Sequence, residues 1–282
     1  MLTVLEIIKK TTDFFAGKSI ESPRLQAELI IGHVLGLKRM QLYLQFERPL
    51  AEPELEKIRP LVRRRSQREP LQYVLGETEF HGLHLKMDRR ALIPRPETEL
   101  LVVSALAACV APPARVLDLG TGSGAIALAI AKEVPGAAVT AVDLSDEALA
   151  LARENAVSTG LGERVAFLKS SWFASLPAGA CFELIVANPP YLSADETAAT
   201  APEVRAYEPA QALTSADGGY ADLRIIIAGA LPFVAPGGLI ALETGIAQHA
   251  ELLALALSSG FDRTESRQDL TGRDRFVLAW RA

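Results

Sequence analysis

The chain has 282 residues, 49% of them hydrophobic and 22% charged, which is typical of a soluble globular protein long enough for two domains. Its two cysteines, Cys109 and Cys181, exclude a disulfide framework or a zinc cluster, and this usage favours a cytoplasmic protein. The net charge of -5 is uneven, because residues 1–95 carry 17 Lys/Arg and 12 Asp/Glu (+5) whereas residues 96–282 carry 12 and 22 (-10). A basic segment is therefore joined to an acidic one.

The first 71 residues are predicted to form a small helical domain. Apolar residues at helical spacing indicate a first helix, with a stripe made of Leu2, Leu5, Ile8 and Phe15. Charged residues between them exclude a signal peptide or a membrane span. Ser22 and Pro23 suit the N-cap and first turn of a second helix, whose apolar residues include Leu25, Leu29, Val34 and Leu35.

A third, charged helix is predicted over residues 52–69, and its second half holds an arginine cluster made of Arg59, Arg63, Arg64, Arg65 and Arg68. Cations near a helix C-terminus are favoured by the helix dipole, so the cluster fits a solvated helix face. The same residues would also suit a docking surface. The sequence leaves both interpretations open and slightly favours the solvated face.

Residues 72–95 change character and predict a β-hairpin linker, because Leu83 and Leu85 alternate with polar residues. His81 and His84 lie here without further ligands nearby, so no metal site is expected. A helix that continues to residue 109 then begins within the run Pro94-Arg95-Pro96-Glu97-Thr98-Glu99.

Residues 96–282 are predicted to form an α/β domain, since strands and helices alternate. Strands are expected at 114–119, 137–143, 164–169, 182–187, 237–243, 261–268 and 275–280. Helices are expected at 124–134, 145–158, 220–233 and 247–258. This alternation argues for a mostly parallel, doubly wound, Rossmann-like sheet of seven strands with helices on both faces. Residues 193–219 form the longest irregular stretch, which is expected to act as a lid or a substrate wall.

The first strand and helix of this domain are joined by a glycine-rich turn with the sequence Asp118-Leu119-Gly120-Thr121-Gly122-Ser123-Gly124. Glycines there let the backbone approach a ligand closely. Alternating glycines after an acid resemble motif I of S-adenosylmethionine-dependent methyltransferases, although the turn nearly fits the dinucleotide pattern as well. Asp143 ends the second strand, where a carboxylate can accept both ribose hydroxyls of either cofactor; the alternative is an N-cap for the next helix.

The fourth strand of the domain runs into a polar corner with the sequence Asn188-Pro189-Pro190-Tyr191. The prolines have no N–H and keep the backbone extended, so two carbonyls and the Asn188 side-chain oxygen are acceptors without a local donor. Tyr191 adds a flat aromatic face. Such a corner suits a planar NH2 group, and the alternative is a strand-ending turn.

In a doubly wound sheet the fourth strand lies beside the first, at the switch point where ligands bind. The glycine-rich turn and the polar corner should therefore face each other across one crevice. A dinucleotide enzyme has no evident need for a corner that holds an NH2 group, whereas a methyltransferase acting on a planar nitrogen does. The position of the corner thus favours S-adenosylmethionine.

With these motifs the chain resembles the HemK/PrmC protein-(glutamine-N5) methyltransferases, which act on the Gly-Gly-Gln loop of peptide-chain release factors. The resemblance covers nearly the whole chain, and the combination of its motifs at this spacing is specific although each motif alone is not. Besides the turn, Asp143 and the corner, it rests on the segments Ser22–Leu29, Pro70–Gly76, Leu92–Glu99, Ser171–Phe173 and Tyr207–Pro209.

The resemblance implies that the chain transfers a methyl group from S-adenosyl-L-methionine to the glutamine of class I release factors, leaving S-adenosyl-L-homocysteine. The methionine and ribose side of the cofactor would be lined by Gly120, Thr121, Gly122, Ser123 and Gly124. Asp143 would hold the ribose, and Trp172 would lie by the adenine. The family often has Asp where this chain has Ser171, so a serine hydroxyl or a backbone carbonyl is expected to replace that adenine contact.

The substrate glutamine would be held by Asn188, Pro189, Pro190 and Tyr191, and Asn188 would also touch the cofactor. A carboxamide nitrogen is a poor nucleophile because its lone pair is delocalised. We expect Asn188 Oδ1 and the Pro189 carbonyl to accept both of its N–H bonds while Tyr191 packs on the amide plane, so that in-line attack depends mainly on positioning. A glutamine is too small to define a protein substrate, so residues 1–71 are expected to dock the release factor.

Other functions stay open from the sequence. An adenine-N6 nucleic-acid methyltransferase also needs a corner for a planar NH2, but it must contact phosphates and the catalytic domain here is acidic. A glutamine methyltransferase of a ribosomal protein would use the same chemistry, and a non-catalytic nucleotide-binding module would not need the intact corner. A monomer without a metal, a membrane partner or a nucleic-acid partner is expected.

Overall fold

The computed structural model describes residues 2–282, and Met1, the first residue of the predicted helical domain, lies outside them. The chain divides into two compact units. Unit 1 comprises Met1–Gly76 and Ala201–Tyr207, and unit 2 comprises Glu77–Thr200 and Glu208–Ala282. The long stretch that follows the polar corner therefore contributes its middle part to unit 1. Within residues 2–282, no helix combines the length and the apolar character needed to cross a membrane.

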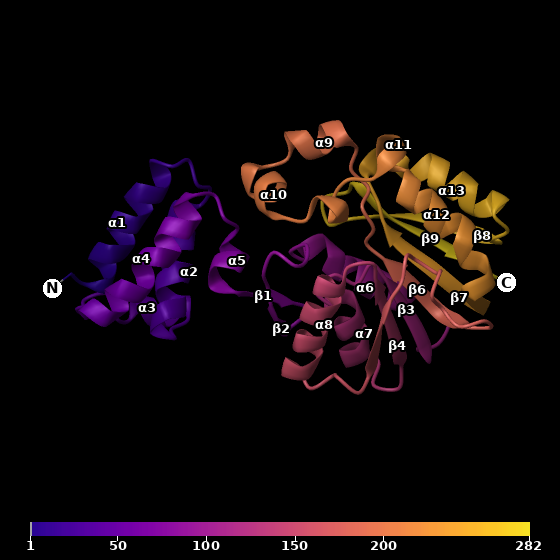
Figure 1. Ribbon diagram of the computed structural model, residues 1–282, viewed down its shortest axis with the longest axis horizontal. Coiled ribbons are helices and arrows are strands. Elements are labelled where there is room, and N and C mark those ends of the chain that lie inside the picture. Colours follow the sequence, from indigo (N-terminus) through magenta and orange to yellow (C-terminus); the bar gives the residue numbers. More distant parts are fainter. Residues whose placement is uncertain (1) are drawn as a thin grey trace. The chain divides into compact units, whose positions relative to one another are not determined.

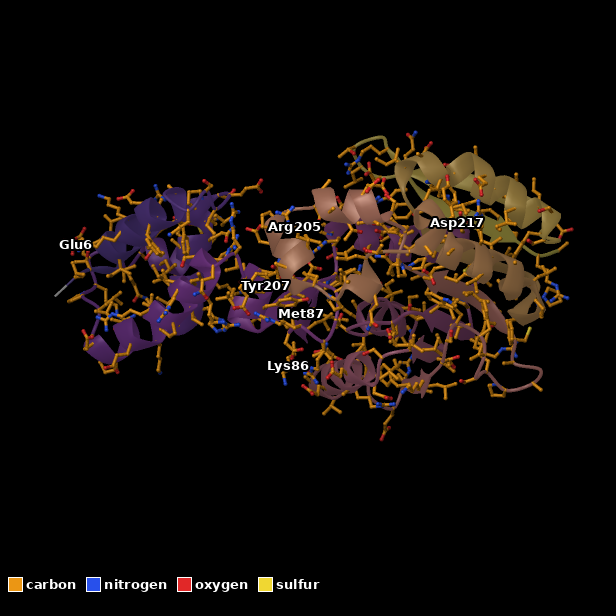
Figure 2. The ribbon with its side chains drawn as sticks, turned by 45° about the horizontal axis from the view of Figure 1, so that its top comes forward. Glu6, Lys86, Met87, Arg205, Tyr207 and Asp217 are labelled. Carbon is orange, nitrogen blue, oxygen red and sulfur yellow. The ribbon has the colours of Figure 1, made fainter. Side chains whose placement is uncertain are left out.

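Unit 1 is helical, as the sequence predicts (Figure 1). Its elements are α1 (Val4–Ala16), α2 (Pro23–Leu35), α3 (Arg39–Tyr43), α4 (Glu52–Ser66), α5 (Leu71–Leu75) and α10 (Pro202–Tyr207). A capping box starts α1, because Glu6 N donates to Thr3 Oγ1 and Thr3 N donates to the Glu6 carboxylate. Figure 2 labels Glu6. The helices enclose buried apolar residues that include Val4, Ile8, Phe15, Ile30, Ile31, Leu42 and Ile58.

Two local expectations for these helices are corrected. The buried face of α1 passes through Val4, Ile8, Thr11 and Phe15, whereas Leu2 and Leu5 are only partly buried. Ser22 does precede Pro23 at the start of α2, but its backbone is left-handed, with φ of 47°, and it makes no side-chain cap. Capping by a serine hydroxyl needs an extended backbone at that residue.

The arginine cluster of α4 is a further correction, because it does not form one solvated face: Arg65 is buried, and Arg64 is partly buried and bonded within the same unit. Arg65 is 4% exposed, and its guanidinium donates to Gln26, to the Glu69 carbonyl and to Glu203. Arg64 pairs with the Glu69 carboxylate and donates to two carbonyls of α5. Apart from Glu69, their acceptors come from α2, α5 and α10, which residue spacing along one helix does not reveal.

Unit 2 is built on a seven-stranded sheet with the spatial order β5-β4-β3-β6-β7-β9-β8. Its strands are β3 (Arg115–Leu119), β4 (Ala138–Asp143), β5 (Val165–Lys169), β6 (Phe182–Ala187), β7 (Val234–Glu243), β8 (Arg263–Gln268) and β9 (Asp274–Trp280). All neighbours run parallel except β9, which is antiparallel to both of its neighbours. The predicted fold class and the seven predicted strands are confirmed.

Helices cover both faces of this sheet (Figure 1). They are α6 (Pro96–Ala108), α7 (Ala125–Glu133), α8 (Asp146–Ser158), α12 (Ala221–Ala230) and α13 (His249–Ser258). Alternate residues of a strand point to opposite faces, so Val116 joins the core with α6 and α7 whereas Leu117 joins the core with α12 and α13. Both faces of the central strands are therefore buried.

The hairpin formed by β1 (Glu77–Phe80) and β2 (Leu83–Lys86) belongs to unit 2. Phe80 and Leu85 are 1% and 0% exposed and join the core beneath α6 and α7. Helix α5, which the sequence grouped with the hairpin in the segment 72–95, falls in unit 1 instead.

The stretch 193–219 is not irregular, because it contains α9 (Ala194–Ala199), α10, a 3-10 turn at Ala210–Ala212 and α11 (Ala216–Gly219). Each of these pieces has six residues or fewer, too short for a helical period to show in the sequence. Its base is closed by backbone bonds from Leu192 N to Leu213 O and from Ser215 N to Leu192 O. The polar corner is thereby anchored at its far end, just after Tyr191.

Candidate active site

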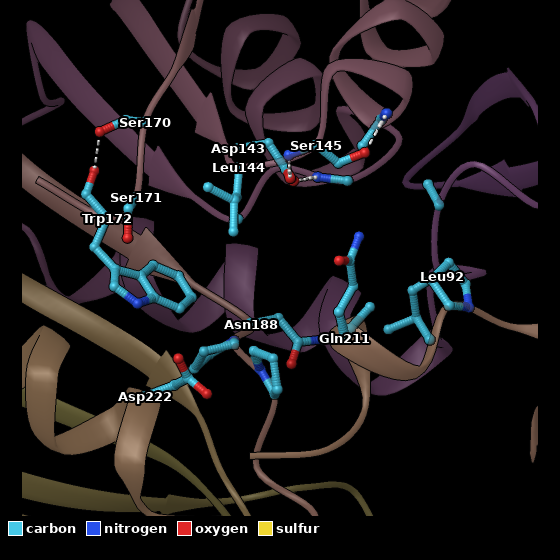
Figure 3. Close-up of a pocket in the computed structure, with 18 of the residues that line it drawn as sticks. Leu92, Asp143, Leu144, Ser145, Ser170, Ser171, Trp172, Asn188, Gln211 and Asp222 are labelled. Atoms are coloured by element: carbon cyan, nitrogen blue, oxygen red, sulfur yellow. Dashed lines mark hydrogen bonds between the residues drawn. The ribbon is translucent and has the colours of Figure 1, made fainter. Parts of the chain in front are cut away.

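The carboxyl ends of β3 and β6 bring the glycine-rich turn and the polar corner together. The two strands are parallel neighbours, with Leu119 opposite Ala187, so the turn and the corner begin at the same level of the sheet. A cavity of about 240 Å³ opens there (Figure 3). The predicted site residues that line it are Gly120, Gly122, Asp143, Trp172, Asn188, Pro189 and Pro190. The remaining predicted ones, outside the lining, are Thr121, Ser123, Gly124 and Tyr191.

The glycine-rich turn is shaped by its backbone. Gly120, Gly122 and Gly124 have φ values of 69°, 56° and 84°, a region that residues with a Cβ rarely adopt. At Gly124 a Cβ would also lie 3.2 Å from the Ala152 side chain, so this glycine lets α7 approach α8. The N–H groups of Gly120 and Thr121 both donate to the Val142 carbonyl at 2.9 Å, which ties the turn to β4.

Asp118 fastens the turn from inside. Its Oδ2 accepts the Thr121 hydroxyl at 2.6 Å and the Ala127 N–H at 3.2 Å, which joins β3, the turn and α7. Complete burial raises the pKa of Asp118 to about 7, an effect that the two hydrogen bonds oppose and the nearby Asp143 reinforces. Thr121 and Asp118 thus hold the turn in shape beneath the cavity.

Asp143 sits at the cavity wall at the end of β4. Its Oδ2 accepts from Gly122 N at 2.8 Å, and its Oδ1 accepts from Ser145 N at 2.9 Å. The N-cap of α8 is Ser145, whose hydroxyl accepts from Ala148 N, so the alternative role of Asp143 as that cap is wrong. Each carboxylate oxygen has a further lone pair, which leaves room for hydroxyl donors from a ligand.

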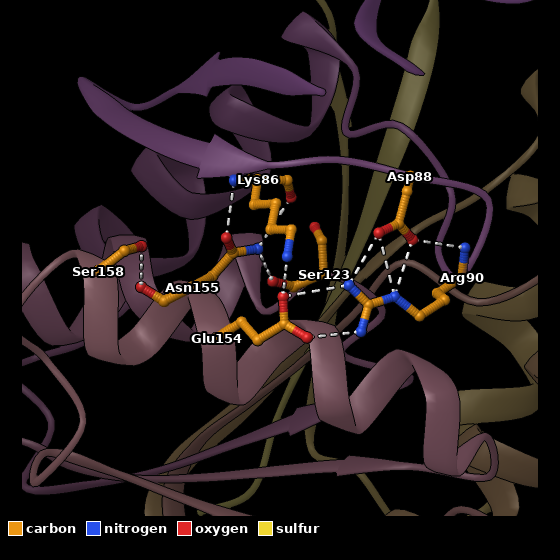
Figure 4. Close-up of polar contacts among 7 residues, drawn as sticks. All are labelled: Lys86, Asp88, Arg90, Ser123, Glu154, Asn155 and Ser158. Carbon is orange, nitrogen blue, oxygen red and sulfur yellow. Dashed lines mark hydrogen bonds and ion pairs between the residues drawn. The ribbon is translucent and has the colours of Figure 1, made fainter. Parts of the chain in front are cut away.

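Asn155 of α8 supports the same wall, although the sequence analysis did not find it. It is fully buried, and its Nδ2 donates to the carbonyls of Ser123 and Lys86 while its Oδ1 accepts from Lys86 N (Figure 4). Beside it, Arg90 bridges Asp88 and Glu154 and reaches the cavity. The available signal was a polar residue on the otherwise apolar face of an amphipathic helix.

The polar corner is held by side chains from two other elements. Asn188 Nδ2 donates to Thr98 Oγ1 at 3.2 Å, and the Thr98 hydroxyl donates to Glu243 Oε2 at 2.8 Å. The Tyr191 hydroxyl donates to Glu243 Oε1 at 3.0 Å. Thr98 and Glu243 are 2% and 1% exposed. Sequence reasoning gave these two residues no role, although Thr98 lies within the segment Leu92–Glu99 and Glu243 ends a strand that the sequence predicts.

Burial raises the pKa of Tyr191, and the neighbouring Glu243 raises it further, so this hydroxyl keeps its proton. Burial also raises the pKa of Glu243, against bonds from Thr98 and Tyr191 and the charge of Arg275. The Tyr191 carbonyl accepts from Gln248 Nε2 at 3.1 Å, which fixes the backbone at the end of the corner.

Leu144 and Trp172 supply apolar surface to another part of the cavity. Leu144 is 63% exposed there, and Trp172 lies so near the turn that a Cβ on Gly120 would meet its ring at 3.4 Å (Figure 3). Trp172 has a left-handed backbone with φ of 48°, and its carbonyl accepts the Ser170 hydroxyl. Ser171 lines the cavity beside them. A flat ring fits between these apolar groups, and Asp143 lies within the same cavity to accept hydroxyls, so the residues present suit a nucleoside-containing cofactor.

Comparisons with known proteins agree with this geometry. Residues 6–76 match the PrmC N-terminal domain family, and residues 97–229 match the methyltransferase small domain family. The chain is 44% identical to the release factor glutamine methyltransferase of Chlorobaculum tepidum, over 97% of this chain and 95% of that protein. The corresponding protein of Geobacter sulfurreducens is 42% identical, over 98% and 95%. A methyltransferase structure from Pyrococcus furiosus shares the fold, with a TM-score of 0.54 and 16% identity over 71% of this chain and 90% of that one.

Proposed function

The chain belongs to the release factor glutamine methyltransferase family, and we propose how its residues divide the work of that reaction. The enzyme transfers a methyl group from S-adenosyl-L-methionine to the side-chain amide nitrogen of a glutamine in release factors. The family of the relatives favours this function over adenine-N6 methylation and over a ribosomal-protein substrate. The observation that carries the proposal is the shared cavity, in which the glycine-rich turn and the polar corner face each other.

The cofactor would lie along the turn, where it supplies a methyl group made electrophilic by the sulfonium. We assign the backbone of Gly120 and Gly122 to its methionine and ribose side and Asp143 to the ribose hydroxyls. Leu144 and Trp172 would enclose the adenine, with Ser171 within the same cavity in place of the family's acid. Thr121, Ser123 and Gly124 would act by holding the turn, since they lie outside the cavity lining.

The substrate glutamine would lie at the corner. Asn188 Oδ1 and the Pro189 carbonyl accept its two N–H bonds, which keeps electron density on the nitrogen and directs the lone pair toward the methyl group. Pro190 keeps the corner rigid and Tyr191 packs on the amide plane. After the nitrogen has gained the methyl group it loses one proton, through Asn188 or directly, to water. The rate then depends mainly on positioning.

Unit 1 is proposed to dock the release factor. All the residues that line the cavity belong to unit 2, so unit 1 is free for a separate task. It has its own groove of about 300 Å³ between α1 and α4, with Phe14 45% exposed in it and Arg59 and Arg63 at its edge. An apolar groove edged by cations suits a protein surface better than a small ligand.

The proposed function is tested with purified enzyme and labelled S-adenosylmethionine. We expect label on the Gly-Gly-Gln glutamine of intact release factor, located by peptide mass spectrometry, and none when that glutamine is replaced by glutamate. Label on DNA, RNA or a ribosomal protein, with none on the release factor, would replace the proposal by one of its alternatives.

The docking proposal is tested by reversing the charge of Arg63, which is exposed. Charges at the edge of an interface act on association and are salt-sensitive, so Arg63→Glu should raise KM for intact release factor several-fold at low salt. Lys57→Glu is the matched control, because Lys57 is exposed on the same helix outside the groove. Activity on a short Gly-Gly-Gln peptide should not change. Equal KM values for both variants and wild type would remove the groove from the docking surface.

A further inference from the structure

One buried carboxylate contacts both side chains on which the polar corner depends. Glu243 ends β7, the parallel neighbour of β6, and the pairing of Ala187 with Leu242 brings it level with Asn188. Its Oε1 accepts the Tyr191 hydroxyl, and its Oε2 accepts the Thr98 hydroxyl. Thr98 in turn contacts Asn188 at 3.2 Å. A single group thus connects to Asn188 through one residue and to Tyr191 directly.

The order of donors in this chain is determined by chemistry. An ionised carboxylate only accepts, and a threonine hydroxyl has a single hydrogen. Because Thr98 gives that hydrogen to Glu243, its oxygen can only accept from Asn188. The Asn188 amide must therefore turn its NH2 group to Thr98, which leaves Oδ1 as the end that is free for a ligand. Burial opposes the ionised form that this order needs, whereas Arg275, 3.9 Å from Glu243 Oε1, and the hydrogen bonds from Thr98 and Tyr191 favour it.

We propose that Thr98 and Glu243 are positioning residues that fix the Asn188 amide with its oxygen toward the substrate. The inference rests on the proposed function and deepens it, because it explains why the corner accepts a group with two N–H donors. An amide turned by 180° would present its own NH2 group to the glutamine NH2, two donors without an acceptor. Glu243 also accepts from the Tyr191 hydroxyl, so one carboxylate positions both Asn188 and Tyr191, the first and last residues of the polar corner.

Thr98→Val tests the proposal, because valine keeps the shape of threonine but neither donates nor accepts. We expect turnover to fall about 10- to 100-fold, in line with the loss of one or two buried hydrogen bonds at a reacting group. Cofactor affinity and the KM for a Gly-Gly-Gln peptide should stay within a few-fold. Thr98→Ser, which restores the hydroxyl, should recover most of the turnover, whereas a role in packing alone would not be rescued by the smaller serine.

A second comparison isolates the path through Asn188. If Thr98 acts by orienting that amide, Thr98→Val should cost little further turnover in an Asn188→Ala background, less than about threefold. A full additional loss in the double variant would show that Thr98 acts in another way and would overturn the proposal.

The amide itself can be observed, because Asn155 and Asn188 are the only asparagines of the 282-residue chain. Protein labelled with 15N-asparagine and saturated with S-adenosylhomocysteine should show two side-chain NH2 signals, both slow to exchange with solvent. Thr98→Val should shift and deprotect the Asn188 signal and leave Asn155, bonded to Lys86 and Ser123, unchanged as an internal control. A fast-exchanging Asn188 signal in wild type would overturn the proposal even if the valine variant failed to fold.

Different results would contradict the proposed function and the positioning role of Thr98 and Glu243. If wild type does not methylate release-factor glutamine, the proposed function is wrong, and the asparagine signals still report whether Thr98 holds the amide. If wild type methylates glutamine and Thr98→Val turns over equally fast, the function stands and the positioning role is wrong.

Discussion

The two walls of the cavity are held in different ways. In the cofactor wall, which consists of Gly120–Gly124 and Asp143, the turn itself contributes mainly backbone groups: Gly120, Thr121 and Gly122 donate N–H bonds to the Val142 carbonyl and the Asp143 carboxylate of the adjacent strand. The substrate wall, Asn188–Tyr191, is fixed by side chains. Its bonds span 90 residues from Asn188 to Thr98 and 52 residues from Tyr191 to Glu243.

This difference separates what each wall can control. The shape of the cofactor wall depends on β3, α7, β4 and α8, which follow one another directly along the chain. The substrate wall needs α6, β6 and β7 to be assembled before its acceptors point the right way. Changes to the first wall should therefore appear in cofactor affinity, and changes to the second should appear in turnover.

The largest effect is expected at the substrate wall. Asn188→Ala removes the side-chain acceptor that we assign to the glutamine NH2, and positioning terms of this kind are worth at least about 100-fold in rate. Single-turnover measurements with saturating labelled cofactor would detect the loss. Because Asn188 also lines the cofactor cavity, a change of a few-fold in cofactor affinity measured by calorimetry is compatible with the comparison. Unchanged turnover on release factor would show that Asn188 does not hold the substrate glutamine.

The difference between the two walls also explains which parts of the site the sequence could predict. Gly120, Gly122 and Asp143 act through local backbone geometry, so a short motif with its spacing was enough to place them. The register of β3 and β6 then followed from the strand order. Thr98 and Glu243 support the polar corner only because the folded chain brings α6 and β7 to the end of β6. No local sequence pattern indicates which distant side chains will meet.

The arginines of unit 1 likewise show that local sequence does not reveal which distant side chains will meet. The sequence placed the arginines in the second half of α4 but did not reveal their partners. Arg65 is buried because Glu203, 138 residues away, supplies a carboxylate to it within the same compact unit. Arg63, two residues earlier, remains exposed. Only the folded chain separates a structural arginine from one that can meet a partner.

The second largest effect is expected at the cofactor wall. Asp143→Ala removes the carboxylate assigned to the ribose hydroxyls, and charge-assisted bonds of this type suggest a loss of cofactor affinity of about 10- to 100-fold. Turnover at saturating cofactor should change much less. Asp143→Asn, which keeps one acceptor oxygen and the size of the side chain, should bind with intermediate affinity. Equal affinities by calorimetry for wild type and both variants would mean that Asp143 only holds Gly122 and Ser145.

The third prediction concerns the stability of the protein and tests whether the cofactor wall depends on the backbone conformation of its glycines. Its expected effect is smaller than those of the first two. Gly124→Ala places a Cβ at φ of 84° and 3.2 Å from Ala152, so we expect a loss of about 1 to 3 kcal/mol in the free energy of unfolding, measured in urea. Gly136→Ala is the matched control, because a Cβ there meets nothing within 4 Å. Equal stability of the two variants would show that the turn tolerates side chains and is not held by its glycines.

The smallest effect concerns pH, through Asp118 beneath the cofactor wall. Burial raises its pKa from 3.8 to about 7 in the folded protein. Between these values the folded state binds more protons than the unfolded state, so the stability contributed by this group is lost as pH rises through 7. From pH 6 to pH 8 the loss from this group alone amounts to about 1 kcal/mol.

Asp118→Asn isolates that contribution, because it keeps an oxygen to accept from Thr121 and Ala127 but does not titrate. Urea unfolding of wild type and variant at several pH values cancels the titration of all other groups in the difference. We expect wild type to lose stability relative to the variant as pH rises from 6 to 8. A difference that stays constant over this range would mean that Asp118 is ionised throughout, and that the bonds from Thr121 and Ala127 outweigh its burial. The cofactor wall would then rest on a buried charge, and removing that charge should weaken the turn at every pH.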